Sequence, residues 1–218
     1  WSFENSKQLT CGDGGIVTCN DEKLAALIRK IGGLGFKTLS ASSGKVRTNR
    51  DKIQHPDYER FDEIGYNYRL GQLAAAVALA QMERNDYFID LRRKMGIGYT
   101  DALVNSDLLT PQRVLDGYYH TFYTFSAKFN GDALGVSWED FRKKYIEYGG
   151  DGIYAASRLQ HQEPVFNDRG IGYGETPVAV ALQKSLMNFT TNQANQEERD
   201  IQIEALQKTQ KYFGDNLA

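Results

Sequence analysis

The chain has 218 residues, enough for one large domain or two small ones, and 41% of them are hydrophobic and 25% charged, as in ordinary globular proteins. Its formal net charge of −2 gives no overall electrostatic reason to bind nucleic acid or an anionic membrane. No apolar run approaches the ~20 residues needed to cross a bilayer, and no secretory signal pattern is visible.

The first 64 residues alternate between polar loops and one amphipathic segment. Residues 1–20 read as loop, glycine turn and then a strand at Ile16-Val17-Thr18. Asn20 is the candidate N-cap of a helix over 21–31, whose leucines and isoleucines share one face. Residues 32–64 are glycine-rich and polar, and loops of this length are usually functional or disordered.

The rest of the chain alternates helices and strands. The pattern predicts an alanine-rich helix to about residue 85 that continues, straight or bent, to about 104; a strand over 123–129; a helix from Ser137 to Tyr148; a short strand at 153–154; a helix from Pro177 to about Leu186; and a last helix from Asn195 to about Phe213. This alternation predicts the α/β class, with a domain change near residue 86.

The cysteines and histidines form no recognisable framework. Cys11 and Cys19 flank a glycine-rich turn without metal-binding spacing, and His55, His120 and His161 are scattered singly. We therefore expect no disulfide framework and no metal site, and a cytoplasmic location is the simplest prediction. The chain opens on Trp-Ser-Phe without a methionine or an element start signal, which suggests a larger protein.

Lys7 is the first candidate for chemistry. A lysine among serine, asparagine and glutamine is most often a solvated surface charge. Here the small polar side chains are followed by Gly12-Asp13-Gly14-Gly15, whose backbone N–H groups could cradle a phosphate. The spacing of a P-loop is absent.

Two ordered blocks resemble one known family. Ser2-Phe3-Glu4-Asn5-Ser6-Lys7, followed by Thr10-Cys11-Gly12-Asp13-Gly14-Gly15, is similar to the cofactor-lysine segment of the DegT/DnrJ/EryC1/StrS aminotransferases, although Glu is commoner than Asp at position 13. Gly65-Tyr66-Asn67-Tyr68-Arg69-Leu70 and the alanine-rich segment after it resemble a second block of that family. A late segment, Gly174-Glu175-Thr176-Pro177, resembles its small domain only loosely.

The resemblance implies the C-terminal part of a fold-type-I transferase that depends on pyridoxal 5'-phosphate (PLP). Residues 1–86 would end the large cofactor domain, and residues 87–218 would form the small α/β domain. The implied reaction moves an amino group, from glutamate as the expected donor, to a ketosugar that is usually nucleotide-linked. A homodimer with shared active sites is implied, as is an N-terminal portion that carries the remaining cofactor contacts.

The resemblance also implies site roles. Lys7 would carry PLP as a Schiff base and then transfer protons as general base and acid. Ser2 would bind the PLP phosphate, or only satisfy local backbone groups. Asn67 would reach the phosphate of the neighbouring subunit's PLP, and Arg69 would assist there or form a structural ion pair.

Several alternatives stay open. Sugar dehydratases of this family carry histidine in place of the lysine, so Lys7 favours transamination. An inactive fragment or regulatory module of the same fold is the non-enzymatic alternative. The basic stretch from Lys45 to Lys52 could meet a substrate diphosphate or be a solvated face. His161 falls where the family places a loop on the substrate side.

Overall fold

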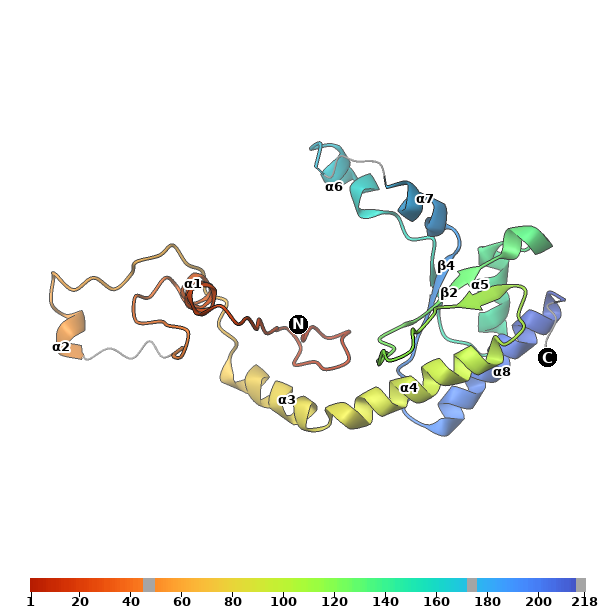
Figure 1. Ribbon diagram of the computed structural model, residues 1–218, viewed down its shortest axis with the longest axis horizontal. Helices are drawn as coiled ribbons and strands as arrows, with labels where there is room; N and C mark the ends of the chain where they lie inside the picture. Colours follow the sequence, from red (N-terminus) through yellow and green to blue (C-terminus); the bar gives the residue numbers. More distant parts are fainter. Residues whose placement is uncertain (45–49, 172–175, 215–218) are drawn as a thin grey trace. The chain divides into compact units, whose positions relative to one another are not determined.

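The computed structural model describes residues 1–44, 50–171 and 176–214. It divides into two compact units, Trp1–Asn85 and Asp86–Ala218 (Figure 1). The assignment of these units to the large and small domains of a transferase remains a prediction.

Helices and short strands make up the described elements. The helices are α1 (Glu22–Gly32), α2 (Arg50–Ile53), α3 (Gln72–Glu83), α4 (Asn85–Ala102), α5 (Trp138–Glu147), α6 (Pro164–Asn167), α7 (Pro177–Gln183) and α8 (Gln196–Tyr212), with 3-10 turns η1 (Gly131–Leu134) and η2 (Gln160–Gln162). The strands are β1 (Leu109–Pro111), β2 (Phe125–Phe129), β3 (Tyr154–Ala155) and β4 (Leu186–Phe189).

The first unit begins with a hairpin that is followed by α1. The cap of α1 is Asp21, not the predicted Asn20: the Asp21 carboxylate accepts the N–H of Leu24 at 2.9 Å. Both residue types cap well, and the one adjacent to the first helical residue takes the role. The strand predicted at Ile16-Val17-Thr18 does not form; Gly15, just before it, makes one isolated bridge with Ser2.

The polar segment after α1 is held by a few long-range contacts. Isolated bridges pair Gly33 with Asn67 and Phe36 with Phe61. An ion pair of 2.6 Å joins Lys30 to Asp62. Of the predicted basic stretch, Lys45 and Arg47 lie outside the described residues, while Arg50 and Lys52 are in α2.

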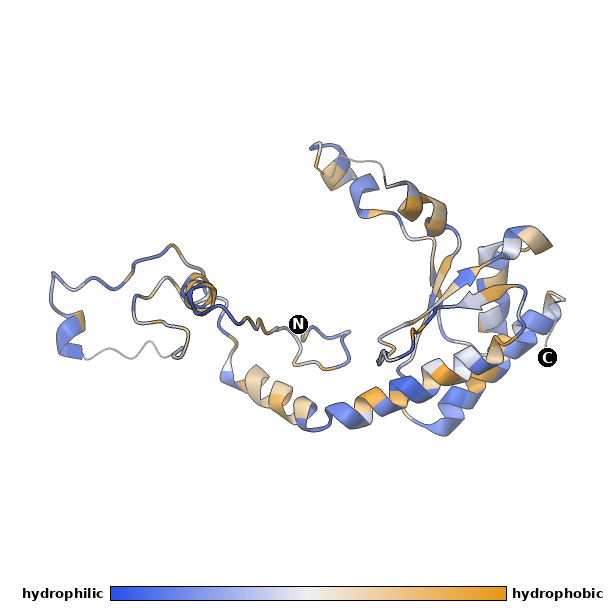
Figure 2. Ribbon diagram, in the orientation of Figure 1, coloured by the Kyte–Doolittle hydropathy of each residue, from blue (hydrophilic) through white to orange (hydrophobic). Residues whose placement is uncertain are grey.

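Helix α3 is apolar along its length and has no buried residue. Figure 2 colours most of it as hydrophobic. Leu73 is 87% exposed and Leu79 is 63% exposed, and these two side chains lie on different sides of the helix. The helical segment predicted to continue to about residue 104 is instead two helices, because α3 ends at Glu83 and α4 begins at Asn85.

The second unit is built on a four-stranded antiparallel sheet with the order β1-β2-β4-β3. The central strands β2 and β4 pair Phe125 with Phe189 and Ala127 with Met187 (Figure 1). These four side chains are buried. Because residues two apart point to one face of a strand, this register places all four on the same side of the sheet.

Aromatic rings fill the core of the second unit. Tyr99 of α4 lies 5.1 Å from Phe125 and 5.4 Å from Phe189 between ring centroids. Its hydroxyl is 3.2 Å from that of Tyr145, which donates to Gln202 Oε1 at 2.7 Å. Burial raises the pKa of both tyrosines well above the ordinary value. The hydroxyls therefore stay neutral and satisfied inside the core.

Helix ends in this unit follow local sequence signals. Ser137 caps α5 through the N–H of Asp140, and Asn195 caps α8 through the N–H of Glu198, both as predicted. The predicted strands near 123–129 and 153–154 are β2 and β3, and the predicted helix from Pro177 is α7, which ends earlier at Gln183. Strands β1 and β4 were not predicted.

A close approach between α4 and the segment before β2 yields the first prediction. A methyl group on Gly96 would overlap the ring of buried Phe122, whose φ of 47° already lies in the left-handed region. We expect Gly96→Ala to destabilise the second unit by roughly 1–3 kcal/mol through overpacking. Chemical denaturation of the full-length protein, followed by aromatic circular dichroism, measures the change.

Gly98→Ala is the matched control in the same helix. There the added carbon meets only the flexible end of Ile203, at 2.7 Å from Cδ1. The gain in helix propensity of about 1 kcal/mol should offset the small displacement. Equal losses in the two variants would contradict the steric explanation.

Candidate active site

Lys7 lies in a loop whose ends form an antiparallel ladder. The N–H of Phe3 donates to the carbonyl of Gly14 at 2.8 Å, and the N–H of Ile16 donates to that of Trp1 at 2.9 Å. The two backbones meet so closely that a Cβ on residue 15 would lie 2.8 Å from the Trp1 carbonyl oxygen. Glycine is therefore required there for the ladder to close.

The carbonyl oxygen of Phe3 accepts two further hydrogen bonds within the loop. It accepts the N–H of Cys11 at 3.0 Å and the hydroxyl of Thr10 at 3.3 Å. Thr10 Oγ1 in turn accepts the N–H of Gly12 at 3.1 Å. The glycine segment that follows Lys7 is thus tied to the residue after Ser2.

Glu4 forms the turn that presents Lys7. Its carbonyl accepts the N–H of Lys7 at 3.0 Å. Its carboxylate Oε2 accepts both the N–H of Ser6, at 3.0 Å, and the Ser6 hydroxyl, at 2.6 Å. Its own N–H donates to Ser2 Oγ at 3.3 Å. Lys7 is half-buried in this arrangement, and Ser2 is exposed.

The second block places Asn67 and Arg69 together. Arg69 Nε donates to Asn67 Oδ1 at 3.0 Å. This contact orients the amide, because the oxygen must face the guanidinium, so the two N–H donors of Asn67 point elsewhere. Both side chains are exposed. The surrounding backbone is held to α1, since the N–H of Tyr68 donates to the carbonyl of Gly32 at 2.8 Å.

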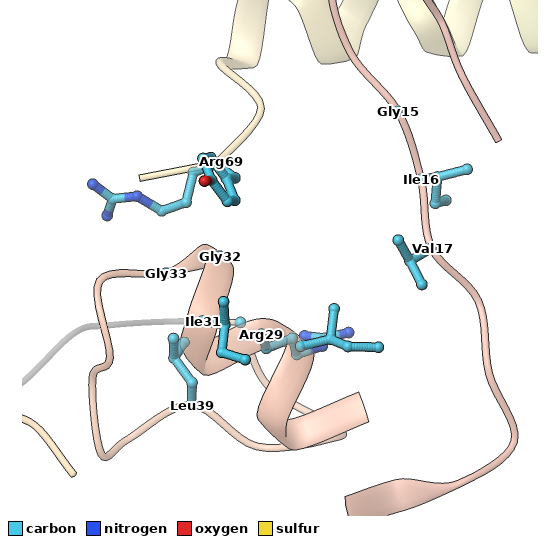
Figure 3. Close-up of a pocket in the computed structure, with 12 residues that line it drawn as sticks. Gly15, Ile16, Val17, Arg29, Ile31, Gly32, Gly33, Leu39 and Arg69 are labelled. Carbon is cyan, nitrogen blue, oxygen red and sulfur yellow. The ribbon is translucent and has the colours of Figure 1, made fainter. Parts of the chain in front are cut away.

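A pocket of about 490 Å³ lies within the first unit, between α1, the segment Gly15-Ile16-Val17 and the second block (Figure 3). Its lining residues are mostly apolar and include two arginines: Gly15, Ile16, Val17, Ile28, Arg29, Ile31, Gly32, Gly33, Leu39, Gly44, Tyr68 and Arg69. Figure 3 shows the segment Gly15-Ile16-Val17 on one side and the end of α1 on another. Ser2, Lys7 and Asn67 do not line it.

The two blocks of the predicted site also meet beside this pocket. A Cβ built on Gly14 would lie 3.0 Å from Leu70 Cδ1, so the leucine after Arg69 packs beside the glycine turn. The structure thus brings the segment of Lys7 and that of Arg69 together in one unit. Glu4 is the polar residue that the sequence did not single out.

The remaining sequence candidates contribute little to this site. His161 lies in η2 of the second unit. Gly174 and Glu175 of the late segment are outside the described residues. Within the described ranges, no cluster of three or more His, Cys, Asp or Glu side chains could hold a metal ion. No described helix combines the length and apolarity required to span a membrane.

Comparison with known proteins defines the class of the chain. The model of the DegT/DnrJ/EryC1/StrS aminotransferase family matches residues 1–206. The chain belongs to this family, whose members bind PLP, so the predicted family is confirmed. The described fold is a mixed α/β fold that corresponds to about half the length of PLP-dependent sugar aminotransferase structures, which confirms the predicted fold class.

Individual relatives are distant and longer. The chain is 24% identical over 218 residues to the "Pleiotropic regulatory protein" of Geobacillus stearothermophilus. This match covers 98% of the chain and 52% of that protein. It is 30% identical over 139 residues to the GDP-perosamine synthase of Caulobacter vibrioides, covering 63% of this chain and 32% of that protein. An aminotransferase structure from Psychrobacter cryohalolentis matches with a TM-score of 0.81 at 19% identity, over 98% and 56% of the two chains. The chain therefore spans about half the length of the relatives that match nearly all of it.

Proposed function

We propose that the full-length protein transfers an amino group, with glutamate as donor, to a ketosugar that is nucleotide-linked, using PLP bound at Lys7. The observation that carries this proposal is the half-buried Lys7 in a closed hairpin loop with Ser2, in the segment that resembles the family's cofactor lysine. The relative named a GDP-perosamine synthase supports a nucleotide-linked sugar as substrate.

The residues present fit PLP. Ser2 Oγ accepts a hydrogen bond from Glu4, so its own proton remains available for a phosphate oxygen. Gly12 has φ of 88° and open space where a side chain would stand, which leaves the backbone of the glycine turn accessible. A lysine amine and hydroxyl, amide and guanidinium donors are the groups that an aldehyde cofactor with a phosphate requires.

Each residue then has a defined task. Bound PLP supplies an electron sink that stabilises negative charge on the substrate carbon. Lys7 Nζ would hold the cofactor and, after release, would move a proton between that carbon and C4′ of the cofactor. Ser2 donates to the cofactor phosphate. Asn67 donates its amide N–H groups to the cofactor phosphate of the neighbouring subunit. Arg69 keeps that amide oriented.

The proposed assembly is a homodimer in which Asn67 serves the site of the neighbouring subunit. Its support is that the Asn67 amide donors are exposed and directed away from Arg69. We also propose that residues 1–86 end the large cofactor domain and residues 87–218 form the small domain. The division of the structure between Asn85 and Asp86 supports this boundary.

A regulatory module without catalysis is the second candidate. Its support is the name of the relative from Geobacillus stearothermophilus, which matches nearly the whole chain. Visible absorbance of bound PLP that borohydride bleaches, with the label on Lys7, separates an enzyme from such a module. An amine product, rather than a deoxysugar, separates the transaminase from a dehydratase.

Lys7→Ala tests the assignment directly. In the full-length protein we expect turnover to fall by a factor of at least about 10², because the proton-transfer group is removed. Sugar transamination, followed by the amine product, is the measurement. Lys23→Ala, which removes an exposed lysine of α1, is the matched control and should retain activity.

Borohydride labelling completes that test. Reduction of the holoprotein followed by peptide mass mapping should place PLP on Lys7 and should give no label in the Lys7→Ala variant. Near-normal turnover of Lys7→Ala with added PLP would overturn the assignment.

A third prediction concerns the isolated chain of 218 residues. We expect it not to transaminate, because relatives that match its whole length are about twice as long and the proposed reaction needs the rest of their cofactor site. Amine formation by the purified chain, with its mass verified, would show that these residues suffice.

Subunit mixing tests the shared site. If Lys7 and Asn67 of opposite subunits build one site, Lys7→Ala and Asn67→Ala homodimers should each be impaired at both sites. A hybrid dimer contains one site with both defects and one intact site. Activity should rise on mixing, towards half of the wild-type value per hybrid dimer.

The Asn67→Ala variant should also bind PLP more weakly. A hydrogen bond to a charged phosphate is worth about 1.5–3 kcal/mol, which corresponds to roughly tenfold to a hundredfold in affinity. If subunits exchange and activity stays at the average of the two variants, Asn67 does not act across a subunit boundary.

A further inference from the structure

We propose that Glu4 is a positioning residue that sets the geometry of Lys7 and Ser2 in the cofactor loop. This inference rests on the proposed function, and it assigns a role to a residue that the family resemblance leaves unspecified. The N–H, the carbonyl and the carboxylate of Glu4 each form hydrogen bonds within one short segment, with Ser2, Lys7 and Ser6 respectively.

The backbone of Glu4 connects the two proposed cofactor ligands. Its N–H donates to Ser2 Oγ at 3.3 Å, and its carbonyl accepts the N–H of Lys7 at 3.0 Å. Ser2 and Lys7 would hold opposite ends of the cofactor, the phosphate and the reactive carbon. The position of one relative to the other therefore depends on the conformation of Glu4.

The side chain of Glu4 fixes that conformation. Oε2 accepts both donors of Ser6, the N–H at 3.0 Å and the hydroxyl at 2.6 Å. Ser6 is the second central residue of the turn that Glu4 and Lys7 close. These two hydrogen bonds from Ser6 to Glu4 Oε2 form a brace that stabilises the turn. Hydrogen bonds to a carboxylate are roughly twice as strong as those between neutral groups.

Charge keeps this brace in place at working pH. The two hydrogen bonds from Ser6, and then the positive charge of Lys7, lower the pKa of Glu4 below its ordinary value. The carboxylate therefore remains ionised at neutral pH. Its acceptor role is lost only as the pH falls through that lowered pKa.

For the reaction, the role of Glu4 is to orient the Lys7 amine. Lys7 has a long flexible side chain, so its amine can transfer a proton efficiently only if the backbone that carries it is fixed. A displacement of about 1 Å in such a group can cost on the order of 10² in rate. Sugar binding does not depend on this orientation. Loss of the brace should thus lower kcat and leave KM for the sugar nearly unchanged.

The test compares Glu4→Ala with Glu4→Gln in the full-length holoenzyme. Alanine removes both accepted hydrogen bonds, whereas glutamine keeps an oxygen that can accept them. We expect Glu4→Ala to lower kcat about tenfold and to slow covalent attachment of added PLP to Lys7, followed by visible absorbance, by a similar factor. Glu4→Gln should restore most of both rates. Glu22→Ala, which removes an exposed carboxylate of α1, should match the wild type.

A double-mutant cycle with Ser6→Ala identifies the partner. If Glu4 acts through Ser6, the effects of Glu4→Ala and Ser6→Ala on the attachment rate should be less than additive in the double variant. Thermal unfolding of the four proteins shows whether the loop alone is affected. We expect equal midpoints within error.

The outcomes separate the two proposals. Failure of borohydride to label Lys7 in the wild type would defeat the proposed function itself. A labelled wild type, together with a Glu4→Ala variant whose attachment rate and kcat are unchanged, would overturn the role of Glu4 alone. A loss in Glu4→Ala that Glu4→Gln does not restore, or that follows a fall in the unfolding midpoint, would also overturn it.

Discussion

The backbone ladder that closes the lysine loop is the constraint on which the candidate site depends. It places the segment after Gly14 against the first three residues, and this approach is possible only because residue 15 has no side chain. The same ladder aligns Ser2 with Gly15, and Gly15 lines the pocket that Arg69 also reaches. The ladder thus holds part of the first block in the wall of a pocket that the second block also lines.

The two units differ in how well they bury their own apolar residues. In the second unit, aromatic side chains from α4, β2, β4 and α5 form a closed core. In the first unit neither α1 nor α3 has a buried residue, and side chains such as Leu73 and Ile64 are more than 80% exposed. This contrast agrees with a chain that spans half the length of its relatives.

Local signals made parts of the fold predictable. The caps at Ser137 and Asn195 were identified because each interaction lies within four residues, whereas choosing between Asn20 and Asp21 required the actual geometry. Strands β1 and β4 were missed because their pairing with β2, between residues about 20 and about 60 apart, leaves no local signature in the sequence. The site residues came from the resemblance, and Glu4 was missed because its contacts fall at a position where the motif names no residue type.

The charges around the loop suit an anionic cofactor. The Nε–H of Arg69 donates to Asn67 Oδ1, so the amide N–H groups of Asn67 point away from Arg69. The pair therefore offers hydrogen-bond donors to a ligand. Ser2 accepts from Glu4 and keeps a proton to donate. Glu4 carries a negative charge in this loop, and its Oε2 accepts hydrogen bonds from Ser6 within the turn. Because a carboxylate aimed outward would repel a phosphate, the internal use of Glu4 makes an acid in this segment compatible with the proposed binding of an anionic cofactor there.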